Sequence, residues 1–372
     1  MQRSKSLAVL AASAAMVVTT VVGPIAGAQT PVKIAGGFAL TGAESSLDVP
    51  AYNGAMLALD EINAAGGILG APAELLVRDS QYDMAVTAQV AQQSVEEDKV
   101  NAFIGYTDSD SVLASGRIFQ DAGIPYLTVG ATSPKLPSQI GDKVFLAAFG
   151  DNVQAAAGAE FAQAQFGDTA YLLWDKGVEY TTLLAAYFKD AFTQAGGTIV
   201  LEDSYETDAT DFSAQITKLK ALPEQPAFYY IAAMPYNVGP VVKQLRDAGL
   251  TGPVVGGDGY DTPDIVTVAG AAAENVFFST HALMDTAGGT DAVKAFMAAY
   301  EAKYGHPVEN SFAALGYDSM KLIAATIDAA GSTDGAAIVA QLEATQGFPG
   351  VTGSISFSPG GSRISGISQG RT

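Results

Sequence analysis

Residues 31–78, PVKIAGGFALTGAESSLDVPAYNGAMLALDEINAAGGILGAPAELLVR, decide the fold class. The apolar start of this stretch predicts a buried strand that ends in a polar loop over 41–48. Residues 52–65 carry apolar side chains at the spacing of one helix face, and two glycines close that helix. A second strand follows at 73–78. A strand, a helix and a strand of these lengths are typical of a parallel sheet wound by crossover helices.

The same alternation continues along the chain and then restarts. The first unit adds helices and strands at 85–98, 101–105, 110–122 and 125–129. After an extended segment at 144–149, the second unit is predicted at 152–166, 169–174, 181–195, 198–201, 211–221, 227–231, 238–248 and 253–255. The prediction is therefore an α/β protein made of two doubly wound parallel-sheet lobes.

The last part of the chain has too few strands to form a third domain. A strand at 275–279 is followed by three helices, at 291–304, 311–330 and 335–345, and by a strand at 351–357. We expect these helices to return to the first unit and cover it. Two lobes joined by several chain crossings would suit hinge closure on a ligand.

The N-terminal segment predicts export. Arg3 and Lys5 precede an apolar run at 7–22, and Ala26-Gly27-Ala28 has the small residues of a cleavage site. We interpret residues 1–28 as a signal peptide. A single membrane anchor is the alternative, but the run is shorter than the roughly 20 residues that span a bilayer.

Composition narrows the class of protein further. The formal net charge of −20 disfavours binding to nucleic acid or to anionic lipid surfaces. The chain contains no cysteine, so neither a thiol nucleophile nor a lipid anchor on cysteine is available. With 48% hydrophobic residues, a sizeable core is expected. The interpretation is a soluble protein of the periplasm.

Sequence signatures of an enzyme are missing. The first strand leads into a glycine-containing loop that lacks the spacing and the lysine of nucleotide-binding motifs. Only two histidines occur, and we expect structural roles for both His281 and His306. We therefore expect no catalytic residue, no metal and no cofactor. An exported hydrolase that uses Asp108 and Asp110 as paired carboxylates is a further alternative.

Polar clusters stand where predicted strands end, and ligands of open α/β sheets bind at that edge. In the first unit Ser109 and Thr132 would supply hydroxyl donors near helix N-termini, which favour a carboxylate; simple capping is the alternative. In the second unit Tyr180 precedes a helix. Asp258 follows a strand and would hold an ammonium group, unless it is only a turn residue.

These residues carry a resemblance to the leucine/isoleucine/valine-binding proteins of ABC transporters. The matching phrases are Asn53-Gly54-Ala55, Ile62 to Gly70, Gly130 to Pro134, Asp211 to Ala214 and Gln244 to Leu250. The resemblance implies a type I periplasmic-binding fold with a hinge and three crossovers, near Phe149, Thr280 and Pro349. The first lobe would comprise 29–149 and 281–349, and the second 150–280 and 350–372.

The resemblance also implies a ligand site. The α-carboxylate would meet Ser109, or Ser111 as the next choice, together with Ala131 and Thr132. The α-ammonium would meet the Ala131 carbonyl and Asp258, and Tyr180 would close over the ligand. Asp108 and Asp110 flank Ser109 and complete the predicted ligand-binding set. Their charge leaves three ligand classes open: a cationic amine, a hydroxylated amine, or an amino acid whose carboxylate the helix dipole screens.

The implied function is capture of an amino acid or related amine for an ABC importer. The partners would be this small ligand and an inner-membrane permease, with the protein acting as a monomer and binding no nucleic acid. The alternative is a periplasmic sensor of the same fold that passes a signal to a membrane receptor.

Overall fold

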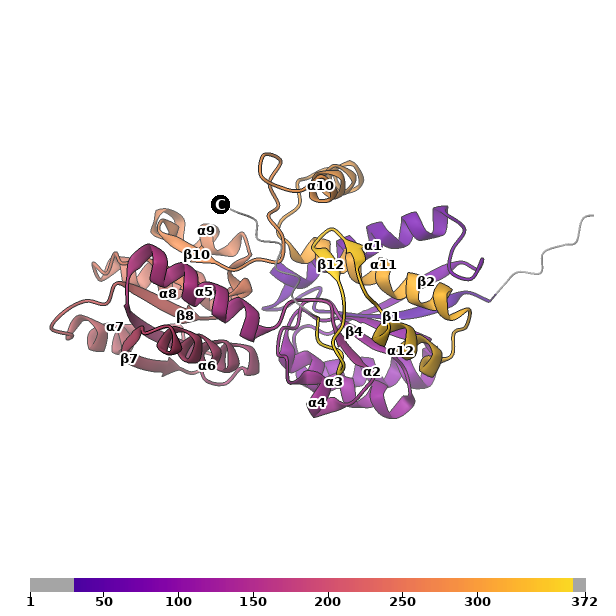
Figure 1. The fold of residues 1–372 in the computed structure, drawn as a ribbon, viewed down its shortest axis with the longest axis horizontal. Helices are drawn as coiled ribbons and strands as arrows, with labels where there is room; N and C mark the ends of the chain where they lie inside the picture. The colour runs from indigo at the N-terminus through magenta and orange to yellow at the C-terminus, as the bar shows by residue number, and fades with distance from the viewer. Residues whose placement is uncertain (1–29, 364–372) are drawn as a thin grey trace, which may run out of the picture.

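The computed structural model describes residues 30–363 and consists of two α/β lobes that lie side by side (Figure 1). Each lobe contains a five-stranded parallel sheet. The first sheet has the order β2-β1-β3-β4-β5 and the second the order β7-β6-β8-β9-β10. The two orders are the same doubly wound topology. The predicted fold class, two doubly wound α/β lobes, is confirmed.

The strands of the first sheet are β1 (Val32–Phe38), β2 (Ala73–Asp79), β3 (Ala102–Gly105), β4 (Tyr126–Thr128) and β5 (Val144–Leu146). The strands of the second sheet are β6 (Thr169–Asp175), β7 (Thr198–Tyr205), β8 (Phe228–Ala232), β9 (Val254–Gly256) and β10 (Val276–Phe278).

Helices cover both faces of the first sheet. On β1, neighbouring residues point to opposite faces, so Ile34 packs in one core cluster and Ala35 in another. Beside Ile34 lie α1 (Ser45–Ala64), α11 (Phe312–Ala330) and α12 (Gly335–Glu343). Beside Ala35 lie α2 (Met84–Gln93), α3 (Ser109–Ala122) and α4 (Leu136–Ile140). This burial on both faces explains the near-continuous apolar strands.

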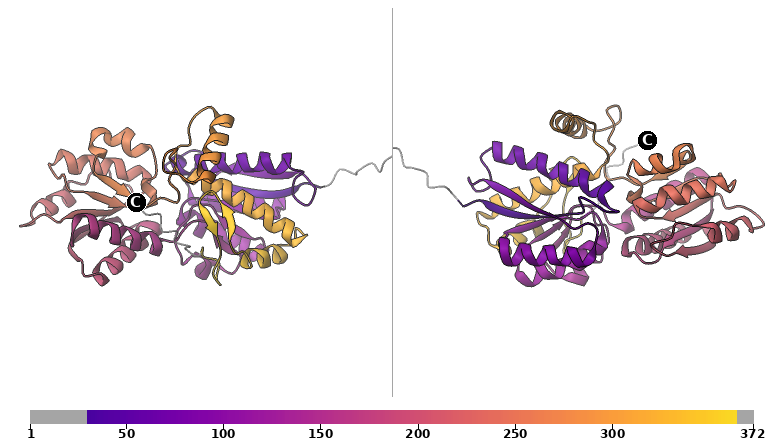
Figure 2. Two further views of the ribbon diagram at one scale, coloured as in Figure 1. Left: turned by 45° about the horizontal axis from the view of Figure 1, so that its top comes forward. Right: turned by 180° about the vertical axis from the view of Figure 1, so that it is seen from behind.

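The second lobe is built in the same way. One face of its sheet is covered by α7 (Ser213–Lys220), α8 (Pro235–Asp247) and α9 (Asp264–Ala269). The other face is covered by α5 (Asp151–Phe166) and α6 (Glu179–Gln194). Each lobe therefore has core clusters of its own on both faces of its sheet, and Figure 2 shows the two lobes as separate layered units.

The prediction that the C-terminal helices return to the first unit is confirmed. Helix α11 packs directly on α1, and α10 (Asp291–Tyr304) contributes to a smaller cluster above them. The two helices meet at glycines: a Cβ on Gly54 would lie 1.8 Å from the Ala313 carbonyl oxygen, and one on Gly316 would lie 1.9 Å from that of Ala51. Only residues without a side chain permit this approach.

One predicted crossing is absent from the described residues. The chain crosses between lobes after β5 and again after β10, but not near Pro349. The short strands β11 (Phe348–Gly350) and β12 (Gly353–Ile355) pair with each other, and Ile355 and Phe357 pack in the first-lobe core. The assignment of 350–372 to the second lobe is therefore wrong for 350–363, because these apolar side chains are buried on the first lobe.

Arg363 holds residues 350–363 against the segment after β5, where the chain first crosses between the lobes. Its buried guanidinium donates to the Ala147 carbonyl at 2.7 Å and to the Thr352 carbonyl at 2.9 Å, and it lies 4.3 Å from the centre of the Phe149 ring. Burial lowers the pKa of Arg363 to about 10.

Three smaller predictions also need correction. Helix α1 begins at Ser45, inside the loop predicted at 41–48. The helix predicted at 85–98 stops at Gln93 and continues as one π-helical turn, η1 (Ser94–Asp98). The strand predicted at 351–357 is the β11–β12 hairpin.

The predicted signal peptide, 1–28, lies outside the described residues. In residues 30–363 no single helix is long and apolar enough to cross a membrane. Helices α11 and α12 reach that length and hydropathy only when taken together, and the chain bends by 112° between them.

Candidate functional site

A narrow cavity lies between the lobes, at the carboxyl ends of both sheets. It is lined by Glu44, Leu47, Thr107, Asp108, Ser109, Thr132, Tyr180, Met234, Pro235, Asp258, Gly259 and Phe312. Most of these residues come from the loops that follow β1 and β3 in the first lobe and β6, β8 and β9 in the second. In both sheets the order reverses beside the first strand, so these loops separate and leave a crevice.

The first-lobe wall is built around the N-terminus of α3. Tyr106 has a φ of 56°, in the left-handed region, and turns the chain sharply after β3. Asp108 is the N-cap of α3, and its Oδ1 accepts a hydrogen bond from the Ser111 N–H at 2.8 Å. Ser109 is fully buried, and its Oγ accepts from the Ser133 N–H at 3.2 Å. The helix cap is thus the aspartate, which leaves the Ser109 hydroxyl proton free for another acceptor.

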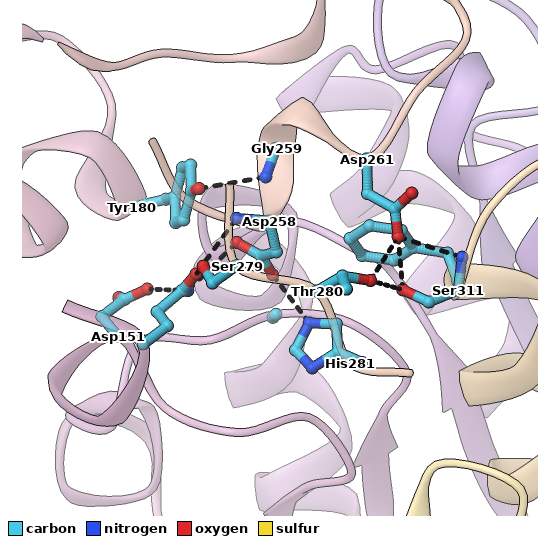
Figure 3. Close-up of polar contacts among 12 residues, drawn as sticks. Asp151, Tyr180, Asp258, Gly259, Asp261, Ser279, Thr280, His281 and Ser311 are labelled. Carbon is cyan, nitrogen blue, oxygen red and sulfur yellow. Dashed lines mark hydrogen bonds and ion pairs between the residues drawn. The ribbon is translucent and has the colours of Figure 1, made fainter. Parts of the chain in front are cut away.

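The second-lobe wall is centred on Asp258, which is 3% exposed (Figure 3). Gln154 donates from Nε2 to Asp258 Oδ1 at 3.0 Å and accepts from the Asp258 N–H at 3.0 Å. His281 Nε2 lies 2.8 Å from Asp258 Oδ2. Tyr180 is placed beside it, because its hydroxyl accepts from the Gly259 N–H at 3.1 Å. These bonds fix the carboxylate and the phenol at the edge of the cavity.

The structure brings together five of the predicted residues: Asp108, Ser109, Thr132, Tyr180 and Asp258 all line the cavity. The other three do not line it. The side chain of Ser111 is buried on α3, and Ala131 packs in the first-lobe core.

Asp110 instead links the lobes. Its Oδ2 accepts from the Glu179 N–H of the second lobe at 3.2 Å. Burial, with repulsion from Asp108 as the second cause, raises the pKa of Asp110 to about 7. The two carboxylates proposed as a hydrolytic pair therefore have different partners: Asp108 caps its own helix and Asp110 meets the N-terminus of α6.

Several site residues escaped the sequence interpretation. Gln154 lies within α5 and has no motif, yet it holds Asp258 and also accepts from Ser279 Oγ at 2.8 Å. His281 was expected to be structural, and it is buried between Phe149 and Phe312 while it contacts Asp258. Its position just after the strand that ends the second lobe was the only signal. Glu44 lies within the polar loop predicted at 41–48, where no motif distinguishes it.

The cavity is strongly acidic. Glu44, Asp108 and Asp258 line it, and within residues 30–363 no lysine or arginine does. Burial, followed by repulsion from Asp108, raises the pKa of Glu44 well above its usual value. Burial likewise raises the pKa of Asp108. Such a cavity attracts cations and disfavours anions.

Asp261 joins the lobes on the far side of Asp258 (Figure 3). Its Oδ2 accepts from the Ser311 N–H at 3.1 Å, from Ser311 Oγ at 2.6 Å and from Thr280 Oγ1 at 2.7 Å. Ser311 is the N-cap of α11, a first-lobe helix, whereas Asp261 belongs to the second lobe. A second-lobe carboxylate therefore satisfies a first-lobe helix N-terminus, where negative charge is favourable.

Replacing Asp261 with alanine is expected to weaken ligand binding by about tenfold, because closure would lose hydrogen bonds to a charged acceptor. Isothermal titration calorimetry measures the affinity, and small-angle scattering measures the lobe separation. The control is Asp190→Ala, on the exposed face of α6. Equal affinities for the Asp261 and Asp190 variants would contradict a latching role.

Comparison with known proteins gives a consistent result. The sequence model described as periplasmic binding protein matches residues 31–366. The chain is 29% identical over 306 residues, 82% of this chain and 79% of the relative, to the leucine-, isoleucine-, valine-, threonine-, and alanine-binding protein of Pseudomonas aeruginosa. It is 30% identical over 303 residues, 81% and 80% of the two chains, to the Leu/Ile/Val-binding protein homolog 3 of Brucella melitensis.

Solved structures agree with these relatives. The branched-chain amino acid transporter substrate binding protein LivJ of Streptococcus pneumoniae, in complex with isoleucine, superposes with a TM-score of 0.83 at 30% identity, covering 90% of this chain and 94% of that one. The leucine binding protein LivK of Thermotoga maritima gives a TM-score of 0.83 at 29% identity, covering 90% and 93%. The chain therefore belongs to the periplasmic binding protein family and is a relative of the Leu/Ile/Val-binding proteins of ABC transporters.

Proposed function

We propose that this chain is the periplasmic substrate-binding protein of an ABC importer and captures an amino acid or related amine between its lobes. The observation that carries the proposal is the buried cavity into which Ser109 and Thr132 face from one lobe and Tyr180 and Asp258 from the other. Relatives with the same architecture are named for binding branched-chain amino acids.

Each end of the ligand would meet a different lobe. The carboxylate of an amino acid would lie at the N-terminus of α3, with the Ser109 and Thr132 hydroxyls as donors. The ammonium group would bind Asp258, and the Tyr180 hydroxyl would donate to the ligand. Contacts to both lobes favour the closed form over the open one, which provides the free energy for closure. An inner-membrane permease would then bind the closed monomer.

A ligand screen tests this function. Amino acids, amines and small carboxylates are added to the purified protein, and the melting temperature is measured. At a concentration of about 100 Kd the ligand should raise the melting temperature by about 5 °C or more. Calorimetry should give one site per chain, and mass spectrometry should recover the ligand unchanged. No binding by any compound, or chemical turnover of the bound one, would contradict the proposal.

A further inference from the structure

Glu44 is a buried carboxylate without a partner. It is 1% exposed, and in the described part of the chain its Oε2 has no hydrogen-bond partner. Its backbone carbonyl accepts from the Leu47 and Asp48 N–H groups at 3.0 and 3.1 Å, so the start of α1 fixes the residue in place. Its side chain lines the cavity between the lobes.

Asp108 presents a second unpartnered oxygen to the same cavity. Its Oδ1 is used to cap α3, whereas Oδ2 has no partner among residues 30–363, and the residue is 3% exposed. The neighbouring Asp48 differs, because its two oxygens accept from the Ala39 N–H at 2.6 Å and the Thr107 N–H at 3.1 Å. Both oxygens of Asp48 therefore have structural partners, whereas Asp108 uses only Oδ1 in this way and Glu44 Oε2 has no partner among residues 30–363.

Two buried carboxylate oxygens without partners carry a large desolvation cost. A ligand cation placed between them would offset that cost with charge-assisted hydrogen bonds. Asp258 is a separate acceptor on the opposite wall, already positioned by Gln154 and His281. A zwitterionic ligand has one ammonium group. If that group binds Asp258, the two first-lobe carboxylates remain unpaired.

Resting on the function proposed above, we propose that the ligand carries a second cationic group, an ammonium or guanidinium, which binds between Glu44 and Asp108. The two cationic groups would be joined by a short apolar chain, since Leu47 and Phe312 also line the cavity. The substrate class is therefore a basic amino acid or a diamine, in preference to an uncharged aliphatic amino acid. Glu44 is the residue that sets this preference.

Four matched ligands test the inference by calorimetry. Lysine and norleucine differ only in the terminal amine, and cadaverine and pentylamine repeat that pair without the carboxylate. We expect lysine to bind about 30-fold or more tightly than norleucine, or cadaverine than pentylamine. Comparison of lysine with cadaverine then distinguishes a basic amino acid from a diamine.

The variant Glu44→Gln keeps the shape of the side chain and is expected to reduce that preference to less than about fivefold, with little change for norleucine. The control is Glu160→Gln, which is exposed on α5. Asp108→Asn, which retains a good helix cap, should act in the same direction as Glu44→Gln.

Three results would overturn the inference or the role of Glu44. If norleucine or leucine binds as tightly as lysine and cadaverine, the second cationic site is wrong while the proposed function stands. If none of the four ligands binds, the inference is also wrong, and the leucine measurement then shows whether the proposed function fails with it. An unchanged preference in Glu44→Gln likewise overturns the role of Glu44.

Discussion

Replacing Asp258 with asparagine is expected to weaken binding of an amine ligand by about 100-fold or more. Asp258 is 3% exposed and already held by Gln154 and His281, so its carboxylate is positioned before the ligand arrives. Asparagine has nearly the same size but no charge, and one side of the amide presents a donor to the ammonium group. Loss of one partner in a buried charge pair costs about 2–5 kcal/mol, much of it because the other charge stays unpaired. Calorimetry with the ligand found in the screen measures the change.

The design separates binding from folding. Asp190→Asn makes the same chemical change on an exposed face of the second lobe and should leave affinity unchanged. Asp258→Ala removes the acceptor altogether and should weaken binding at least as much as Asp258→Asn. Circular dichroism should show the native helix content in all three variants. If Asp258→Asn binds the ligand with wild-type affinity, Asp258 does not bind the ammonium group.

The fold was predictable because its signals are local. The apolar strand at 32–38 follows from its spacing, and the end of α1 follows from the glycines at 66 and 67. The later strand–helix pairs repeat that pattern. The loops that carry the cavity were predictable for the same reason, since ligands of parallel sheets bind where strands end. Ser109, Thr132, Tyr180 and Asp258 were identified in this way.

What sequence reasoning missed depends on long-range geometry. Gln154 lies on α5 and reaches Asp258 across more than a hundred residues, and nothing in its own helix distinguishes it from the neighbouring glutamine positions. The sequence interpretation pairs Asp108 with Asp110, but Asp108 is the N-cap of α3 and lines the cavity, whereas Asp110 lies in the first turn and contacts the second lobe. The third crossing was expected by resemblance, whereas the burial of Phe357 beside Phe145 holds that segment on the first lobe.

Replacing Gly316 with alanine is expected to lower the free energy of unfolding, because Gly316 lies where α11 packs against α1. A Cβ on Gly316 would lie 1.9 Å from the Ala51 carbonyl oxygen and 2.7 Å from its carbon, and both are backbone atoms of a buried helix. Because neither atom can move alone, Gly316→Ala must separate the two helices. Overpacking typically costs about 1–3 kcal/mol and more where backbone is involved, so we expect a loss of about 3 kcal/mol or more. The melting temperature should fall by about 6 °C or more.

Gly158→Ala is the matched control for this prediction, and it should change stability in the opposite direction. Gly158 also lies inside a helix, α5, but an added Cβ would meet only Tyr230 ring atoms at 3.5 Å or more, an ordinary contact. Alanine there should stabilise by about 0.5–1 kcal/mol, because glycine is a poor helix former. Urea unfolding followed by circular dichroism measures both variants. If both raise stability, helix propensity outweighs packing and the close α1–α11 contact is wrong. If their signs differ, the contact itself requires glycine at position 316.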